Sequence, residues 1–255
     1  GHSVHLFDIA PRCVVQAPKE LSQSLERELK QYGIQIHTNT NITSIEYTDH
    51  FTIRTENEDF EFDQCIEATG RIGNFNDLGL ENTDVQTTKK YITVNERYQT
   101  SVEHIYAIGD VSGAVQLAHV ASDLGEQIID LITHNKTIQA KTIPYVIYTP
   151  MQAAYAGISE EQAKQMSIKV QVKKVLISGL AKQKIKINRR AYLKLIIDEQ
   201  YHLIGVEILS SDASELINTC ILMMDMQVDM REIPKLVYAH PSMGEIFKEV
   251  RVESF

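Results

Sequence analysis

The first 38 residues set the strongest limit on what this chain can fold into. The run "SVHLFD" (residues 3–8) is typical of a buried parallel strand that is apolar on both faces. In "PKELSQSLERELKQYG" (residues 18–33), Leu21, Leu25 and Leu29 fall on one helical face between an early proline and a final glycine. "IQIHTNT" then predicts another short strand. Strand, helix and strand in this order predict a βαβ crossover.

Between residues 42 and 66 the pattern changes to short strands. The segments "ITSIEY", "FTIRTE" and "FEFDQCIEA", separated by the turns "TDH" and "ENED", predict a small antiparallel meander whose last apolar strand ends at "ATGR". Farther along, "IYAIGD" is expected to be a buried strand and "VQLAHVASDLGEQIIDLITHNK" a long amphipathic helix. This first part of the chain is therefore predicted to be α/β.

A different region begins at "TIPYVIYT". Strands are predicted in "KVQVKKVLI", "AYLKLIID" and "HLIGVEIL", and helices in "DASELINTCILMMDMQV" and "MREIPKLVYAH". Ser159 and Gln162 have the spacing of a capping box, which predicts one more helix. Residues 143–255 are therefore expected to form a separate α+β domain after the α/β part.

Charge and composition exclude several classes of function. The chain has 255 residues and a formal net charge of −9, which argues against nucleic acid or an anionic membrane as the main partner. No apolar run reaches the ~18 residues of a membrane span, and no signal peptide opens the chain. Cys13, Cys65 and Cys220 are few, odd in number and far apart, so we expect a reducing, cytoplasmic compartment. The histidines lack metal-ligand spacing, and no metal is predicted.

Several strand ends are candidate nucleotide contacts. Asp8 ends the first strand, where an acid either binds ribose hydroxyls, as in dinucleotide-binding folds, or simply lies on the surface. Arg12 would suit the 2′-phosphate of NADP, so NADP stays open as the alternative cofactor. Gly70 in "ATGR" either permits close approach of a ligand or is an ordinary turn glycine. Asp110 in "AIGD" either binds a polyol beside a helix N-terminus or caps that helix. His119 is interpreted as a packing or backbone-positioning residue.

A candidate acid/base pair lies near the C-terminus, in "YAHPSMGEIF". A histidine near its ordinary pKa of about 6.5 exchanges protons at neutral pH. Glu245 follows His240 by five residues, and a carboxylate within hydrogen-bond reach fixes the tautomer of an imidazole and raises its basicity. Pro241 directs His240 away from helical geometry. The alternative is a capping or buried structural histidine.

The order of the motifs is more specific than any one of them. "EATGRIGN", "IYAIGDVSGAVQLAHVA", "IPYVIYT…AGISEEQAK", "GVEILSSDASELI" and "YAHPSMGEIFKE" follow one another across essentially the whole chain. In this order they resemble the C-terminal half of the pyridine nucleotide–disulfide oxidoreductases, a family of FAD enzymes. The resemblance implies a partial NAD-binding domain at 1–68, a second FAD-domain segment at 69–140 and a dimerisation domain at 141–255. The family's first half, with its Gly-rich turns and C-x4-C redox disulfide, would be absent.

The resemblance also implies which residues hold cofactors. Asp110 would bind the ribityl chain of FAD. Ala118, with Leu117 and His119, would present its backbone to the pyrimidine end of the flavin. Asp8 would hold the NAD ribose, and Ile42 and Gly70 would line the nucleotide site.

For catalysis, the resemblance implies that His240, oriented by Glu245, is the acid/base that deprotonates a thiol. In this family that histidine reaches the active site of the other subunit. The implied catalytic unit is therefore a homodimer acting on a small-molecule or protein-bound disulfide or dithiol.

The sequence departs from the family pattern at several positions. Gly73 stands where proline is usual, Gln152 where glutamate is usual, and Tyr238 and Ser242 replace a histidine and a threonine beside His240. The chain ends without the paired cysteines of mercuric reductase, and Asp8 favours NAD, so dihydrolipoamide dehydrogenase is the nearest subclass. Two alternatives stay open: a cofactor-free dimerisation module and an NADH oxidase-like flavoenzyme.

Overall fold

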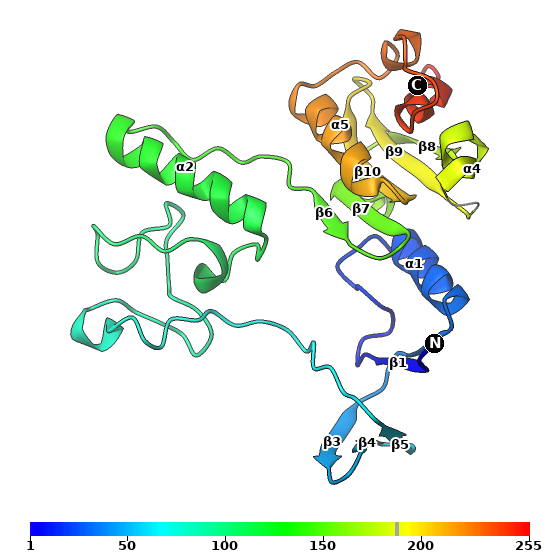
Figure 1. The fold of residues 1–255 in the computed structure, drawn as a ribbon. Coiled ribbons are helices and arrows are strands. Elements are labelled where there is room, and N and C mark those ends of the chain that lie inside the picture. The colour runs from blue at the N-terminus through cyan, green and yellow to red at the C-terminus, as the bar shows by residue number, and fades with distance from the viewer. Residues whose placement is uncertain (187–188) are drawn as a thin grey trace. The chain divides into compact units, whose positions relative to one another are not determined.

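The computed structural model describes residues 1–186 and 189–255, and the chain divides into two compact units (Figure 1). One unit joins Gly1–Cys65 to Thr142–Phe255, and the other is Ile66–Lys141. The first unit therefore contains both ends of the chain and the larger hydrophobic core.

The predicted βαβ crossover is present at the start of the first unit. Strand β1 (Val4–Phe7) pairs in parallel with β2 (Ile34–His37), and helix α1 (Lys19–Gln31) connects them. Leu21 and Leu25 on the apolar face of α1 are fully buried. The prediction that the first strand is buried on both faces was wrong, because β1 is half-buried or exposed. Within the described residues its only sheet partner is β2, so one edge lacks a neighbour.

The antiparallel meander is also present, formed by β3 (Ile42–Tyr47), β4 (Phe51–Thr55) and β5 (Asp59–Phe62). The rings of Phe60 and Phe62 on β5 contact those of β1 and β2, which joins the meander to the crossover. The predicted strand "FEFDQCIEA" ends early at Phe62, since residues 63–68 pair with no described strand.

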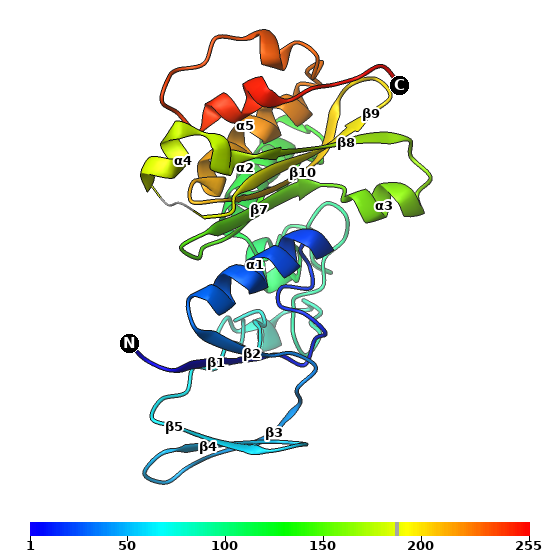
Figure 2. The same ribbon diagram turned by 90° about the vertical axis from the view of Figure 1, so that its right-hand side faces the viewer.

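A five-stranded antiparallel sheet with the order β6-β7-β10-β9-β8 organises the rest of the first unit (Figure 2). Its strands are β6 (Tyr145–Ile147), β7 (Gln152–Gly157), β8 (Val170–Leu176), β9 (Tyr192–Asp198) and β10 (Leu203–Ser210). The sequence did not predict β7, because "QAAYAG" is rich in alanine, which is depleted in strands. Its pairing with β10 and β6 overrides that weak local preference.

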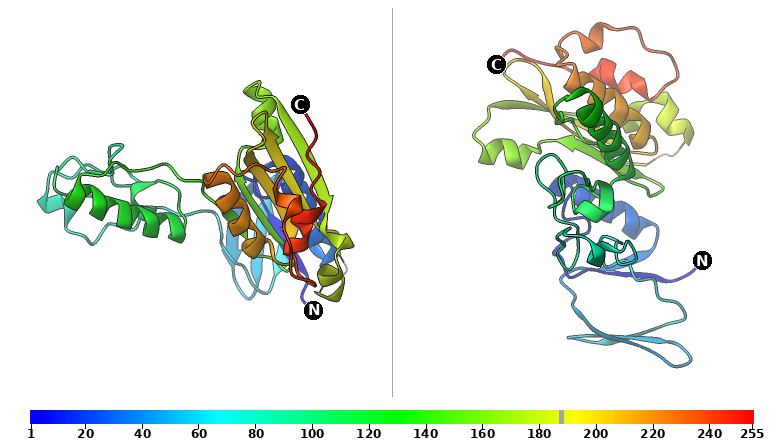
Figure 3. Two further views of the ribbon diagram at one scale, coloured as in Figure 1. Left: turned by 90° about the horizontal axis from the view of Figure 1, so that it is seen from above. Right: turned by 90° about the vertical axis from the view of Figure 1, so that its left-hand side faces the viewer.

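Helices cover both faces of this sheet (Figure 3). Helix α5 (Ala213–Asp225) packs against β10 and β7, and the backbone N–H of Ser214 donates to Gln152. Helix α1 lies against β10 on the opposite face and places Leu21 and Leu25 in the shared core. The βαβ segment and the sheet are therefore one packed body.

Short helices complete the first unit. Helix α3 (Glu160–Gln165) begins with the predicted capping box, in which Ser159 and Gln162 bond each other's backbone. Helix α4 spans Ala181–Lys186, and this unit also contains the 3₁₀ helices η3 (Ile177–Gly179) and η5 (Gly244–Glu249).

The predicted helix "MREIPKLVYAH" was wrong. Only the three-residue 3₁₀ helix η4 (Ile233–Lys235) forms there. Pro234 lacks a backbone N–H and disfavours helical geometry in the residue before it, which explains why an α-helix does not continue.

The second unit contains α2 (Ala118–His134), as predicted, and the 3₁₀ helices η1 (Leu80–Asn82) and η2 (Gly109–Ser112). The predicted strand "IYAIGD" was wrong, because Tyr106 makes only an isolated bridge with Gln99 and residues 109–112 are in η2. A strand needs a continuous ladder with a neighbouring strand, and among the described residues this segment makes only isolated backbone bonds, such as that from the Ala107 N–H to the Tyr98 carbonyl.

Candidate functional site

The C-terminal segment places His240 beside Glu245. The imidazole Nδ1 lies 2.9 Å from Glu245 Oε1, and the backbone N–H of Ser242 donates to Oε2 at 2.8 Å. The peptide bond between His240 and Pro241 is cis. The side chain of His240 is 71% exposed and that of Glu245 21% exposed, so the ring faces outward from an anchored carboxylate.

This geometry defines the chemical state of the pair. The hydrogen bond from the Ser242 backbone, followed by that from His240, lowers the pKa of Glu245. Glu245 is therefore a carboxylate at neutral pH and accepts the Nδ1 proton, which leaves the exposed Nε2 as the proton-accepting atom. A histidine held in one tautomer with an open Nε2 has the arrangement of a general acid/base.

The backbone on either side of His240 is fixed by contacts with the core. The Tyr238 hydroxyl donates to the Ile233 carbonyl oxygen at 2.8 Å, and Ile246 and Phe247 after Glu245 are fully buried. From the sequence, Tyr238 was noted only as a departure from the family pattern. Its hydrogen bond shows that it ties the histidine-bearing segment to η4.

In the second unit, Arg71 brings three predicted segments together. Its guanidinium lies 3.2 Å from Asp110 Oδ2 and donates to the Gln116 carbonyl at 2.6 Å. Arg71 thus links "ATGR", "AIGD" and the residues before α2. The sequence patterns did not assign Arg71 a role, and the signal that could have found it is its place directly after Gly70.

The start of α2 is suited to negative charge. The N-cap residue Leu117 receives no side-chain cap from the described residues, so the partial positive charge at the N-terminus of α2, where Ala118 and His119 lie, is available to an anion. The Nε2 of Gln116, just before the helix, is buried without a hydrogen-bond partner among the described residues. Gly70 has φ of +129°, a conformation that side chains disfavour, which accounts for glycine at this turn.

In the first unit, the structure brings Asp8 close to the start of β3. The Asp8 carbonyl accepts from the Thr40 backbone at 3.0 Å, two residues before Ile42, and Asp8 Oδ1 accepts from the Ala10 N–H at 2.9 Å. Arg12 donates instead to the carbonyls of Val14 and Val15. Asp8 and Ile42 therefore share one region, whereas Gly70 belongs to the second unit.

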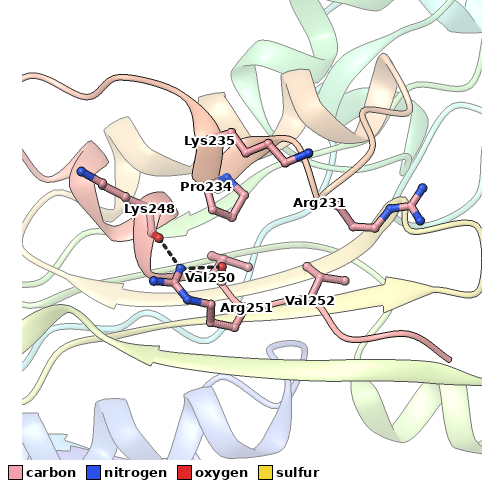
Figure 4. Close-up of a pocket in the computed structure, with 7 residues that line it drawn as sticks. All are labelled: Arg231, Pro234, Lys235, Lys248, Val250, Arg251 and Val252. Atoms are coloured by element: carbon pink, nitrogen blue, oxygen red, sulfur yellow. Dashed lines mark hydrogen bonds between the residues drawn. The ribbon is translucent and has the colours of Figure 1, made fainter.

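A groove of about 380 Å³ opens between η4 and the C-terminal segment (Figure 4). It is lined by Arg231, Pro234, Lys235, Lys248, Val250, Arg251 and Val252. Arg231 pairs with Asp229, Lys235 pairs with Glu232, and Arg251 donates to backbone carbonyls. None of the predicted site residues lines this groove, and its cations are largely engaged elsewhere.

Among residues 1–186 and 189–255, no cluster of three or more histidine, cysteine, aspartate or glutamate side chains is placed to hold a metal ion. In the same part of the chain, no helix is long and apolar enough to cross a membrane.

Two family descriptions match this chain. Residues 1–125 match the pyridine nucleotide-disulphide oxidoreductases, and residues 143–251 match the dimerisation domain of the same family. The chain therefore belongs to the pyridine nucleotide-disulphide oxidoreductase family. The predicted fold class, a partial α/β domain followed by an α+β dimerisation domain, is confirmed.

Similar proteins of established function include dihydrolipoyl dehydrogenases. The chain is 29% identical over 261 residues to a dihydrolipoyl dehydrogenase of Bacillus subtilis, covering 98% of this chain and 55% of that protein. It is 30% identical over 235 residues to the dihydrolipoyl dehydrogenase of Chlamydia pneumoniae, covering 91% and 51%. The chain spans about half the length of the curated relatives it matches.

A solved structure shares the fold. The HOCl-induced flavoprotein disulfide reductase RclA from Escherichia coli superposes with a TM-score of 0.91 at 22% identity, covering 98% of this chain and 59% of that one.

Proposed function

We propose that this chain is part of an FAD-dependent NAD(P)H:disulfide oxidoreductase of the dihydrolipoamide dehydrogenase type. The similarity to dihydrolipoyl dehydrogenases along almost the whole chain supports this reaction class. The observation that carries the proposal is the 2.9 Å contact between His240 Nδ1 and Glu245 Oε1, with the imidazole largely exposed.

The pair acts as the acid/base of thiol–disulfide exchange. His240 Nε2 takes the proton from a substrate or cysteine thiol, because the thiolate and not the thiol attacks a disulfide. The imidazolium that forms is stabilised by the Glu245 carboxylate, whose second oxygen stays bonded to Ser242. In the reverse direction His240 returns the proton to the departing thiolate.

The second unit fits one end of a flavin. Asp110 offers a carboxylate for the ribityl hydroxyls, and Arg71 holds that carboxylate in place. The uncapped N-terminus of α2, at Leu117, Ala118 and His119, suits the electron-rich pyrimidine end of the ring. FAD bound there would carry electrons between the nicotinamide and the disulfide.

Nucleotide contacts complete the proposal. Asp8 holds the NAD ribose, and Ile42 and Gly70 line the nucleotide site. In this scheme the segments 1–68, 69–140 and 141–255 are the NAD-binding, FAD-binding and dimerisation parts. The matched dimerisation domain supports a homodimer, in which His240 serves the neighbouring subunit. Dithiol chemistry also suits a reducing, cytoplasmic compartment.

The test compares His240→Gln with the parent in the full-length enzyme. We expect dihydrolipoamide turnover to fall by roughly 10²- to 10⁴-fold, the usual contribution of a general acid/base. The visible flavin spectrum should stay unchanged, because His240 is not among the proposed flavin contacts. His202→Gln is the matched control, since His202 also lies near a carboxylate, Asp198 at 3.9 Å.

Turnover that is equal in His240→Gln and His202→Gln would contradict the acid/base assignment. A colourless full-length protein that releases no FAD on denaturation would contradict the flavoenzyme as a whole. The two failures are separable because one concerns turnover and the other the bound cofactor.

A further inference from the structure

A row of polar side chains crosses the five-stranded sheet, one from each strand. Cross-strand pairing joins Tyr145 to Tyr155, Tyr155 to Glu207, Glu207 to Lys194, and Lys194 to Lys174. Directly paired residues in antiparallel strands point to the same face. The row therefore lies on one face of the sheet.

Helix α1 covers this row and contributes a further carboxylate. Glu20 bonds to Lys174 and lies 2.9 Å from the Lys194 ammonium, and Glu160 at the start of α3 lies 2.8 Å from the same ammonium. Lys194 is 3% exposed. Burial opposes its charge, but the hydrogen bonds that Lys194 donates to Glu160 and Glu20 outweigh that effect and raise the pKa of Lys194.

Glu207 is the least compensated member of the cluster. It is 1% exposed, lies 3.4 Å from Lys194, and neither of its oxygens has a hydrogen-bond partner among the described residues. Three carboxylates thus share two lysines. An ionised, unbonded carboxylate in the interior is costly, and binding one proton removes that cost.

We propose that Glu207 is a proton-binding site that controls how firmly helix α1 packs on the sheet. When Glu207 is protonated, the Lys194 charge is directed to Glu20 and Glu160, and α1 is held tightly. When Glu207 is ionised, Lys194 is shared with it, and opening of α1 gives the carboxylate access to water.

Charges around the site fix the direction of its titration. Burial raises the pKa of Glu207 to about 7, Lys194 acts in the opposite direction, and the charges of Glu20 and Glu161 raise the pKa further. Glu207 pairs directly with Tyr155 and Lys194 on the neighbouring strands, and Tyr192 lies on the same face of β9. Lys174 and Glu160 are neighbours of Lys194. Because the ordinary value is 4.5, the folded protein holds a proton between about pH 4.5 and 7 that the unfolded chain lacks. Stability from this group is therefore greatest at low pH and declines as pH rises toward 7.

Contacts of α1 extend the effect to the segment that carries Asp8. Glu26 on α1 accepts from the Cys13 backbone N–H at 2.8 Å, and the Ser22 hydroxyl donates to the Cys13 carbonyl. The loop between β1 and α1 is thus bonded to the helix and should loosen with it. This inference concerns packing and does not depend on the flavin chemistry.

The test is amide hydrogen exchange on the full-length protein, followed in peptides covering residues 8–17 and 19–31. After correction for intrinsic exchange, we expect opening to increase about tenfold between about pH 6 and pH 8, the ratio that the two pKa values allow. In Glu207→Gln the increase should disappear, because the amide binds no proton. In Glu215→Gln, an exposed glutamate on α5, the tenfold change should remain.

The same pH dependence in Glu207→Gln as in the parent would overturn the proposal. If Glu207→Gln fails to fold, the protonation of the glutamates in the parent protein is followed instead by ¹³C NMR of their carboxyl groups across pH. One glutamate with a midpoint within about one unit of pH 7 supports the proposal, and the absence of any such glutamate overturns it.

Discussion

Two glutamates of the first unit lie beside a basic side chain, and their surroundings give them opposite properties. Glu245 is paired with an exposed His240, and both of its oxygens accept hydrogen bonds, which lowers its pKa. Glu207 is paired with a buried Lys194 and accepts no hydrogen bond from the described residues, and burial raises its pKa. The difference shows that hydrogen bonding and burial decide the charge state, and the mere presence of a cation does not.

The two pairs therefore respond to pH with opposite sign. Stabilisation from Glu245 is present above the ordinary carboxyl range and is lost as pH falls through its lowered pKa. Stabilisation from protonated Glu207 is present at low pH and is lost as pH rises toward 7. The first pair leaves the exposed imidazole of His240 open to outside chemistry, and the second holds a proton inside the fold.

The largest expected effect comes from breaking the buried pair with Lys194→Met. The change leaves Glu207 and Glu160 without their shared cation, and removing one partner of a buried ion pair typically costs about 3–5 kcal/mol of unfolding free energy. Urea unfolding at about pH 8 measures the loss. Toward about pH 6 the loss should shrink, because Glu207 then takes up a proton.

Lys169→Met is the matched control, because Lys169 forms an exposed pair with Glu199 at 3.2 Å. Exposed pairs contribute about 0–1 kcal/mol, so this variant should unfold almost as the parent does. Equal losses in the two lysine variants would contradict the contrast between the buried and the exposed pair.

An intermediate effect is expected from Glu245→Gln in the full-length enzyme. The amide keeps the shape of the side chain but no longer stabilises the imidazolium, so turnover should fall on the order of a hundredfold. Stopped-flow turnover checks this prediction, and unchanged turnover would contradict the orienting role of Glu245.

The smallest effect is expected from Ser159→Ala. Ser159 caps α3, which presents Glu160 to Lys194, and loss of an N-cap costs about 1 kcal/mol. Urea unfolding measures this loss as well. The double variant of Ser159→Ala and Lys194→Met should lose less unfolding free energy than the two single variants lose together, because the cap also holds Glu160 beside Lys194. If the two losses of unfolding free energy simply add, α3 and the charges around Lys194 are independent of each other.

Local sequence patterns were sufficient for much of the fold. The leucine spacing of α1, the capping box of α3 and the apolar period of α5 depend on neighbours within a few residues, and these elements form as predicted. The contact between His240 and Glu245 was expected from the family resemblance, since spacing alone left a structural histidine open. The assignment of domains and of the cofactor residues stays a prediction.

Tertiary structure decided what depends on partners distant in the chain. Local pattern missed the alanine-rich strand β7 and wrongly predicted a strand at "IYAIGD". A strand forms only where neighbouring strands complete its hydrogen bonds, and local pattern does not show those neighbours. The same holds for Glu207 and Lys194, which are unremarkable in sequence. Only sheet register and the packing of α1 bury them together, and burial is what changes their chemistry.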